Sequence, residues 1–106
     1  MTVLQWHAVD LGIAEMPEIR TLFAQVFGHS MSDALWRWKY DAGRGIATGT
    51  RDEQGRLLAH YGGTARALQV NGVAVSAVQL GDVMVAAQAR GILSRRGPFA
   101  TAATAF

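Results

Sequence analysis

The pair Asn71-Gly72 constrains the fold more than any other feature of this sequence, because it separates two long apolar stretches, 57–70 and 73–85. Both residues tolerate the positive φ angles of a type I′ turn, the tight connection between antiparallel strands. We therefore expect a long hairpin formed by strands over Leu57–Val70 and Val73–Val85. Gly81 interrupts the second strand, and a glycine inside a strand commonly marks a bulge.

Periodic patterns predict further elements around this hairpin. Pro17 suits the first turn of a helix, an apolar stripe follows at helical spacing to Phe27, and Gly28 is a suitable C-terminal cap. The segment Ser30-Met31-Ser32-Asp33 is typical of a capping box and predicts a second short helix. The remaining expected elements are strands over Val3–Val9 and Ile46–Arg51, with a loosening at Gly62-Gly63 in the long strand, and a last helix over Phe99–Phe106. This order predicts an α+β fold, a mostly antiparallel sheet flanked by helices.

Composition excludes several classes of protein. The chain of 106 residues is 50% hydrophobic and 17% charged, as expected for one globular domain. The absence of cysteine excludes disulfides, thiolate catalysis and cysteine-bound zinc, and the three histidines lack metal-ligand spacing. Neither a signal peptide nor a membrane span is visible, which is compatible with the cytoplasm. A net charge of +2 without aromatic-basic interleaving gives no reason to expect nucleic-acid binding.

An arginine- and glycine-rich loop follows the second hairpin strand, and Pro98 then fits an early position of the last helix. Free backbone N–H groups, a helix N-terminus and nearby cations together suit a phosphate. In this interpretation the arginine side chains bind the phosphate, and the glycines allow the backbone to approach it closely. The alternative is a solvated basic loop. The candidate residues are Arg90, Gly91, Arg95, Arg96 and Gly97.

The element order and the end of the second hairpin strand together resemble the N-terminal portion of the GNAT superfamily of acyl-CoA-dependent N-acyltransferases. Asp82-Val83-Met84-Val85, four further residues and Arg90-Gly91 resemble the fourth strand and the opening of the pyrophosphate loop of that family. Two other motifs, Phe23-x-x-x-Phe27-Gly28 and Trp36-x-Trp38-Lys39-Tyr40, resemble a poorly characterised branch of the family. The resemblance implies a single partial GNAT-like domain over residues 1–106.

The resemblance also implies a chemistry: acyl transfer from acetyl-CoA to an amine. Val83 and Val85 would offer backbone groups to the pantetheine arm, and the loop residues would hold the pyrophosphate. Asp82 would act as the general base that removes a proton from the acceptor ammonium, the alternative being an ordinary hydrogen-bonded carboxylate of the strand. Trp36 is expected to pack in the core, whereas Trp38 can either pack or line the acceptor pocket.

The sequence departs from the family at two places. The family loop begins with Arg or Gln and has a Gly three positions later and a Gly or Ala five positions later. Counted from Arg90, these two small positions fall on Leu93 and Arg95. Counted from Gln88, Gly91 fits the first position, but Leu93 occupies the second. Either the loop is longer, with its phosphate nest at 94–99, or phosphate binding has decayed.

The second departure concerns the fifth strand of the family, together with its later helix and two last strands, none of which has a counterpart after Phe106. We therefore expect an incomplete domain that is inactive as an isolated chain. The alternative is a non-catalytic remnant or an interaction domain that forms a homodimer through the exposed edge of Val73–Val85.

Overall fold

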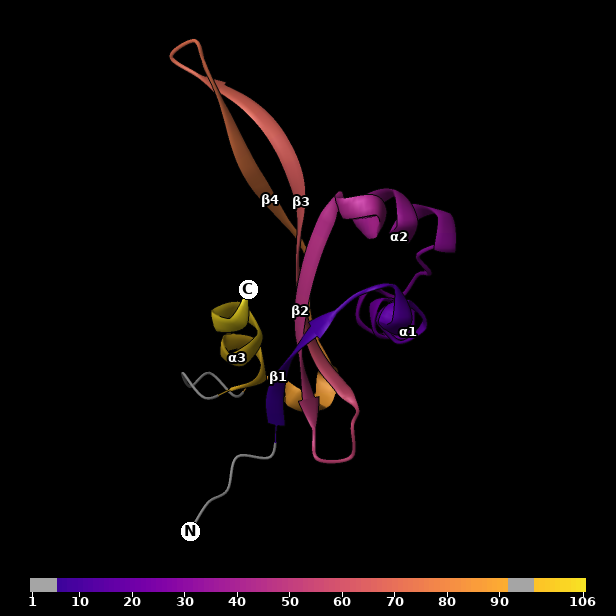
Figure 1. The fold of residues 1–106 in the computed structure, drawn as a ribbon. Helices are drawn as coiled ribbons and strands as arrows, with labels where there is room; N and C mark the ends of the chain where they lie inside the picture. The colour runs from indigo at the N-terminus through magenta and orange to yellow at the C-terminus, as the bar shows by residue number, and fades with distance from the viewer. Residues whose placement is uncertain (1–5, 92–96) are drawn as a thin grey trace.

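A computed structural model describes residues 6–91 and 97–106, which form an antiparallel sheet of four strands in the order β1-β2-β3-β4, with helices on both faces (Figure 1). This confirms the predicted α+β class. The elements are β1 (Trp6–Leu11), η1 (Ile13–Glu15), α1 (Met16–Phe27), α2 (Asp33–Tyr40), η2 (Asp41–Gly43), β2 (Gly45–Asp52), β3 (Leu57–Val70), β4 (Val73–Val85), η3 (Ala87–Ala89) and α3 (Pro98–Ala105).

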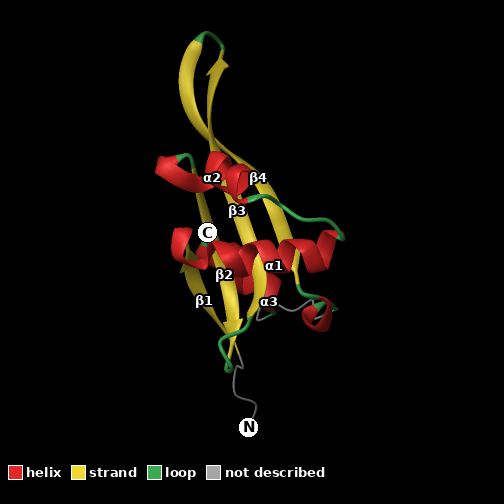
Figure 2. Cartoon of the chain, turned by 90° about the vertical axis from the view of Figure 1, so that its right-hand side faces the viewer, coloured by secondary structure: helices red, strands yellow, loops and turns green. Residues whose placement is uncertain are grey.

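The β3–β4 hairpin is the longest feature of the fold, and its far end extends beyond the rest of the sheet (Figures 1 and 2). Its two strands have the predicted bounds and pair from Ala59 with Val85 to Val70 with Val73. Asn71 and Gly72 have φ angles of 50° and 78°, as a type I′ turn requires. The turn chemistry of two residues thus sets the register of the whole hairpin.

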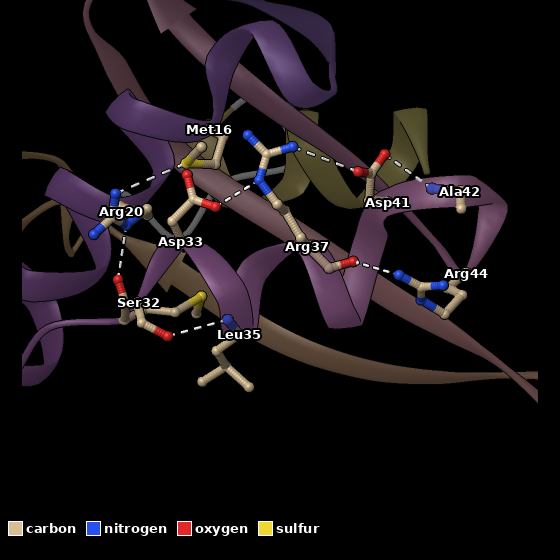
Figure 3. A network of polar contacts seen from close by, with 10 residues as sticks. Met16, Arg20, Ser32, Asp33, Leu35, Arg37, Asp41, Ala42 and Arg44 are labelled. Atoms are coloured by element: carbon tan, nitrogen blue, oxygen red, sulfur yellow. Dashed lines mark hydrogen bonds and ion pairs between the residues drawn. The ribbon is translucent and has the colours of Figure 1, made fainter.

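One face of the sheet carries α1 and α2, and the larger core lies beneath them (Figure 1). Gly28 ends α1 in the left-handed conformation that its sequence position predicts, and its N–H donates to the carbonyl of Ala24. The hydroxyl of Ser32 caps α2 by accepting a hydrogen bond from the Leu35 N–H (Figure 3). The buried side chains of this core include Leu11, Ile19, Leu22, Met31, Trp36, Tyr40 and Met84.

The opposite face carries α3, which is fixed to β2 by two buried threonine hydroxyls. Thr48 Oγ1 donates to the carbonyl of Ala102 and Thr50 Oγ1 to that of Pro98, both at 2.7 Å. Tyr61 adds aromatic contacts with Phe99 and Phe106. Polar bonds and rings therefore attach a helix that has few large apolar side chains of its own.

Two predictions about the strands need correction. The first strand runs on to the buried Leu11, two residues past the predicted end at Val9, while residues 3–5 lie outside the described residues. Gly62 and Gly63 do not loosen β3: both are buried and paired with β4. A Cβ atom on Gly62 would lie 2.5 Å from Tyr40 Oη, so the glycine permits close packing.

Candidate functional site

A β-bulge in β4 shapes the candidate site. His60 pairs with Met84 and Gly62 with Gly81, so the single residue Tyr61 of β3 lies opposite two residues of β4, Asp82 and Val83. Such a two-against-one arrangement bends a strand and turns a side chain to a new direction. Asp82 has a φ of 53°, which is unusual for any residue except glycine. The bulge thus lies directly after Gly81, the residue that predicts it.

His60 holds the backbone of this bulge. Its Nδ1 lies 2.7 Å from the carbonyl oxygen of Asp82, and because a carbonyl can only accept, Nδ1 carries the hydrogen. Burial lowers the pKa of His60 and so favours the neutral ring, although the Asp82 carbonyl acts in the opposite direction. Its Nε2 is buried with no hydrogen-bond partner among the described residues.

The carboxylate of Asp82 is held by two side chains at the end of α2. Lys39 Nζ lies 3.1 Å from each carboxylate oxygen, and Tyr40 Oη donates to Oδ2 at 2.5 Å. Burial, followed by the hydrogen bond to Asp82, raises the pKa of Tyr40 well above its ordinary value, so the phenol remains a donor. The Asp82 side chain is only 9% exposed. This arrangement matches the hydrogen-bonded carboxylate that the sequence left open as an alternative.

Sequence reasoning missed that Lys39 and Tyr40 bind Asp82, although the motif that contains Tyr40 was considered for the acceptor pocket. They lie 43 and 42 positions before Asp82, so no local pattern relates them. The available signal was the motif Trp36-x-Trp38-Lys39-Tyr40 itself, in which the alternate aromatic residues divide between core and surface. Trp36 is buried, as predicted, whereas Trp38 is 63% exposed.

The outer edge of β4 presents backbone groups that the sheet does not use. The N–H of Ala86 donates to the Leu58 carbonyl, so strand alternation turns the N–H of Val85 toward the opposite edge. The Val85 carbonyl on that edge accepts a hydrogen bond from Arg90 Nε at 3.1 Å. Within the described part of the chain, β4 is the last strand of the sheet on this side.

The predicted phosphate residues are only partly placed. Arg90 is exposed and bound to β4 through Val85, and Gly91 has the left-handed φ of 87°. Gly97 is buried and forms the N-cap of α3, with Pro98 as the first helical residue. Arg95 and Arg96 lie outside the described residues, as does Leu93, so the structure describes the position of Arg90 and not that of the other two predicted arginines.

Two small cavities lie between the end of α2 and the hairpin, and one of them reaches the bulge. One has a volume of about 130 Å³, and its lining includes Trp38, Lys39, Tyr40, Gly81 and Asp82. The other has about 140 Å³, and its lining includes Trp38, Lys39, Arg44 and Arg66. Asp82 therefore borders a space that a small polar group can enter. Among residues 6–91 and 97–106, no group of three potential ligand side chains could hold a metal ion.

Comparisons with known proteins agree with this geometry. The family model described as an acetyltransferase (GNAT) domain matches residues 9–97. The fold is similar to a probable N-acyltransferase from Enterococcus faecalis, with a TM-score of 0.69 and 18% identity over 82% of this chain and 22% of that one. It is also similar to a GCN5-related N-acetyltransferase from Kribbella flavida, with a TM-score of 0.68 and 20% identity over 94% and 25%.

A third similar structure is an N-myristoyltransferase from Saccharomyces cerevisiae with bound myristoyl-CoA. Its TM-score is 0.58 and its identity 12%, over 88% of this chain and 25% of that one. The chain thus spans about a quarter of the length of these three structures. No curated protein matches it in sequence. None of the described helices is long and apolar enough to cross a membrane.

Proposed function

Because the chain belongs to the GNAT acetyltransferase family, we propose that it binds a coenzyme A thioester along β4 and contributes to the transfer of the acyl group to an amine. The observation that carries this proposal is the edge of β4 after the bulge, where the Val85 N–H points away from the sheet. An amide in this position can bind an extended ligand as an added strand would be bound. The ligand proposed is acetyl-CoA.

The residues along this edge fit such a ligand in chain order. Val83 and Val85 would bind the pantetheine arm through their backbone groups, and the region from Arg90 and Gly91 to Gly97 would bind the pyrophosphate. The left-handed Gly91 and the Gly97 cap support this assignment, because both allow close approach of backbone to an anion. We include Arg95 and Arg96 as further phosphate ligands. The bound thioester would supply the activated acyl group.

On the acceptor side, we propose that Asp82 takes the proton from the acceptor ammonium. The adjoining cavity supports this role, because it gives a small amine access to the carboxylate. Lys39 would have to leave the carboxylate before a second ammonium could give up a proton there. A purely structural role, in which Lys39 and Tyr40 keep Asp82 in the bulge, uses the same contacts, and the two roles differ in their consequences for turnover.

Titration of the 106-residue chain with coenzyme A, followed by calorimetry and by amide NMR, tests the proposal. We expect saturable binding with the largest shifts at the amides of Val83, Val85 and Gly91. Arg90→Gln should weaken binding, whereas Arg20→Gln, which removes an arginine of α1 that donates to the Met31 carbonyl, should not. No heat and no shift at millimolar coenzyme A would refute the proposal.

Turnover is measured separately, because the chain spans about a quarter of the length of its structural neighbours. Thiol release from acetyl-CoA in the presence of an amine gives the rate, and we propose that this rate is low for the chain in isolation. Asp82→Asn would reduce it and shift its pH profile if Asp82 accepts the proton. An unchanged pH profile at a lower rate would instead assign Asp82 the structural role.

A second candidate function, self-association, is favoured by the hairpin arm, defined here as residues 67–81. The arm has no charged side chain, although exposed sheet edges usually carry charges that prevent pairing. Leu68, Val70, Val73 and Val75 are all exposed, and their register places them on one face. We propose that the arm pairs with the arm of a second copy about a two-fold axis.

Sedimentation over a range of concentrations tests self-association. The unmodified chain should form dimers, and Val73→Lys should shift it toward the monomer. Ile13→Lys places the same charge on an exposed side chain of η1, far from the arm in sequence, and should leave the dimer intact. A monomer at every concentration would refute the proposed dimer.

A further inference from the structure

The two cavities between α2 and the hairpin share four lining residues and so lie next to each other. Trp38, Lys39, Thr64 and Arg66 line both of them. Asp82 lines only the cavity of about 130 Å³, and Arg44 lines only the cavity of about 140 Å³. We call this space the acceptor groove.

The two arginines of the acceptor groove are held in place by neutral groups only. Arg66 donates from Nε to Gln79 Oε1 at 2.9 Å and from Nη1 to the Ala65 carbonyl at 3.0 Å. Arg44 donates from Nε to the Trp38 carbonyl at 2.8 Å. Its Nη2 donates to the Arg37 carbonyl at 3.0 Å (Figure 3). Each guanidinium is thereby oriented while its positive charge has no carboxylate partner in the described residues.

The other cations of this region differ in this respect. Lys39 is paired with Asp82, and Arg37 is paired with both Asp33 and Asp41. All eight acidic residues of the chain lie in the described part, and Asp82 is the one that lines the acceptor groove. The cavity that both Arg44 and Arg66 line therefore has two positive charges with no counter-ion from the described chain.

We propose that the acceptor groove selects an amine that also bears an anionic group, either a carboxylate or a phosphate. The amine lies at Asp82, the anion lies between Arg66 and Arg44, and the connecting atoms lie against the exposed Trp38. This inference rests on the proposed acyltransferase function and specifies its acceptor class. Oriented guanidinium groups suit either anion, because both bind through pairs of oxygen atoms.

The Asp82 end already binds an ammonium group within the chain. Lys39 Nζ contacts both carboxylate oxygens at 3.1 Å, which is the geometry an acceptor amine would need. An ionised carboxylate offers about four lone-pair sites, so an acceptor amine can first bind beside Lys39 and Tyr40, and Lys39 then leaves before the proton is transferred. An acceptor without an anionic group would occupy this end alone and leave the arginines unpaired.

Binding of matched pairs of small amines to the 106-residue chain tests the inference. Phosphoethanolamine is compared with ethanolamine, and 5-aminopentanoate with butylamine, by NMR shifts of the Trp38 indole N–H and by calorimetry. We expect the anionic member of at least one pair to bind about tenfold more tightly, since a hydrogen-bonded charge pair is worth roughly one such factor or more. The pair that discriminates identifies the anion.

Variants locate the effect. Arg66→Gln and Arg44→Gln should each reduce the affinity for the anionic amine about fivefold and leave the affinity for the neutral-tailed amine unchanged. Arg37→Gln removes the same charge from the same part of the molecule, but its guanidinium is already paired, so it should have little effect. An equal loss in Arg37→Gln would reduce the effect to general electrostatics and overturn the proposal.

Other outcomes also decide the question. Equal affinities within both pairs, or no binding of any of the four amines, would overturn the selective groove. Coenzyme A is titrated in the same samples. Coenzyme binding without anion preference refutes the groove alone, whereas anion preference without coenzyme binding supports the groove and refutes the acyltransferase.

Discussion

His60 Nδ1 lies 2.7 Å from the carbonyl oxygen of Asp82, so a buried ring of β3 occupies the position where a bulged β4 has lost its regular ladder partner. This hydrogen bond joins the protonation state of one side chain to the backbone geometry of the candidate site. A second bond, from Tyr40 to the Asp82 carboxylate, holds the same residue through its side chain. Asp82 is therefore fixed at two points.

The first prediction concerns pH and His60. Burial, the main influence, lowers the pKa of His60 below its ordinary value of 6.5, the Lys39 charge acts in the same direction, and the Asp82 carbonyl opposes both. The unfolded chain therefore binds more protons than the folded chain once the pH falls below about 6.5. The free energy of unfolding should then decrease with falling pH, by at most about 1.4 kcal/mol per pH unit from this group. Urea denaturation between pH 7.5 and 5.5 measures this slope.

His60→Asn provides the matching variant, because its amide can still donate to the Asp82 carbonyl but does not titrate. Its unfolding free energy should be lower at pH 7.5 and should depend less on pH than that of the unmodified chain. Glu18, whose pKa is lowered mainly by its hydrogen bond to Arg51, loses its contribution only as the pH falls through and below about 4.5, so it does not confound this window. An identical slope in both proteins would show that His60 does not titrate in this range.

The second prediction concerns the hydroxyl of Tyr40. Tyr40→Phe removes a donor from a nearly buried carboxylate, and we expect it to lower the free energy of unfolding by about 1–3 kcal/mol. Tyr61→Phe is the control, because Tyr61 contacts Phe99 and Phe106 through its ring, and its change should stay within about 0.5 kcal/mol. Equal changes in the two variants, measured by urea denaturation, would contradict the special role of the Tyr40–Asp82 bond.

The third prediction compares two glycines that face each other across the hairpin. A Cβ on Gly62 would lie 2.5 Å from Tyr40 Oη and 2.9 Å from both the Gly81 carbonyl and His60 Cε1. Gly62→Ala should therefore destabilise the chain by about 1–3 kcal/mol and shift the NMR signals of the bulge. Its partner Gly81 has open space around the Cβ position, so Gly81→Ala should be nearly neutral. The reverse order of stabilities would refute the packing described for Gly62.

The fourth prediction concerns the attachment of α3. Thr50→Val leaves the buried carbonyl of Pro98 without its hydroxyl donor, which should cost about 1–3 kcal/mol and accelerate hydrogen exchange in residues 98–105. Thr21→Val breaks a similar hydroxyl bond to the carbonyl of Pro17, but on an exposed helix face, where water replaces the donor. That control should change stability by less than about 0.5 kcal/mol. Unchanged exchange in α3 after Thr50→Val would mean that the rings of Tyr61, Phe99 and Phe106 suffice.

Local chemistry explains why much of the fold is predictable from the sequence. Asn71-Gly72 specifies a turn without help from tertiary contacts, and Gly28 and Ser32 act as helix caps within their own segments. Gly81 likewise predicts the bulge from its own position in the strand. Gly62 misleads for the same reason: a glycine in a strand predicts weakness locally, whereas here it is required by Tyr40, which comes from another element.

The candidate site is less predictable, because its decisive contacts join distant parts of the chain. Asp82 is a candidate from the motif alone, but its partners Lys39, Tyr40 and His60 lie 43, 42 and 22 positions away. Their meeting depends on how α2 crosses β3 and β4, which no periodicity specifies. The orientation of the Val85 N–H likewise depends on the register after the bulge and not on the residue itself.

The two threonine hydrogen bonds beneath α3 fix the position of the helix along β2. Thr48 and Thr50 are two residues apart on β2, a rise of about 6.8 Å, and their acceptors Ala102 and Pro98 are four residues apart on α3, a rise of about 6 Å. Because Thr48 bonds to the later helix residue and Thr50 to the earlier one, α3 runs antiparallel to β2, and the matching spacings let both bonds form in this alignment. Inserting or deleting one residue between 98 and 102 would break at least one of the two bonds, so this stretch should tolerate substitutions far better than changes in length.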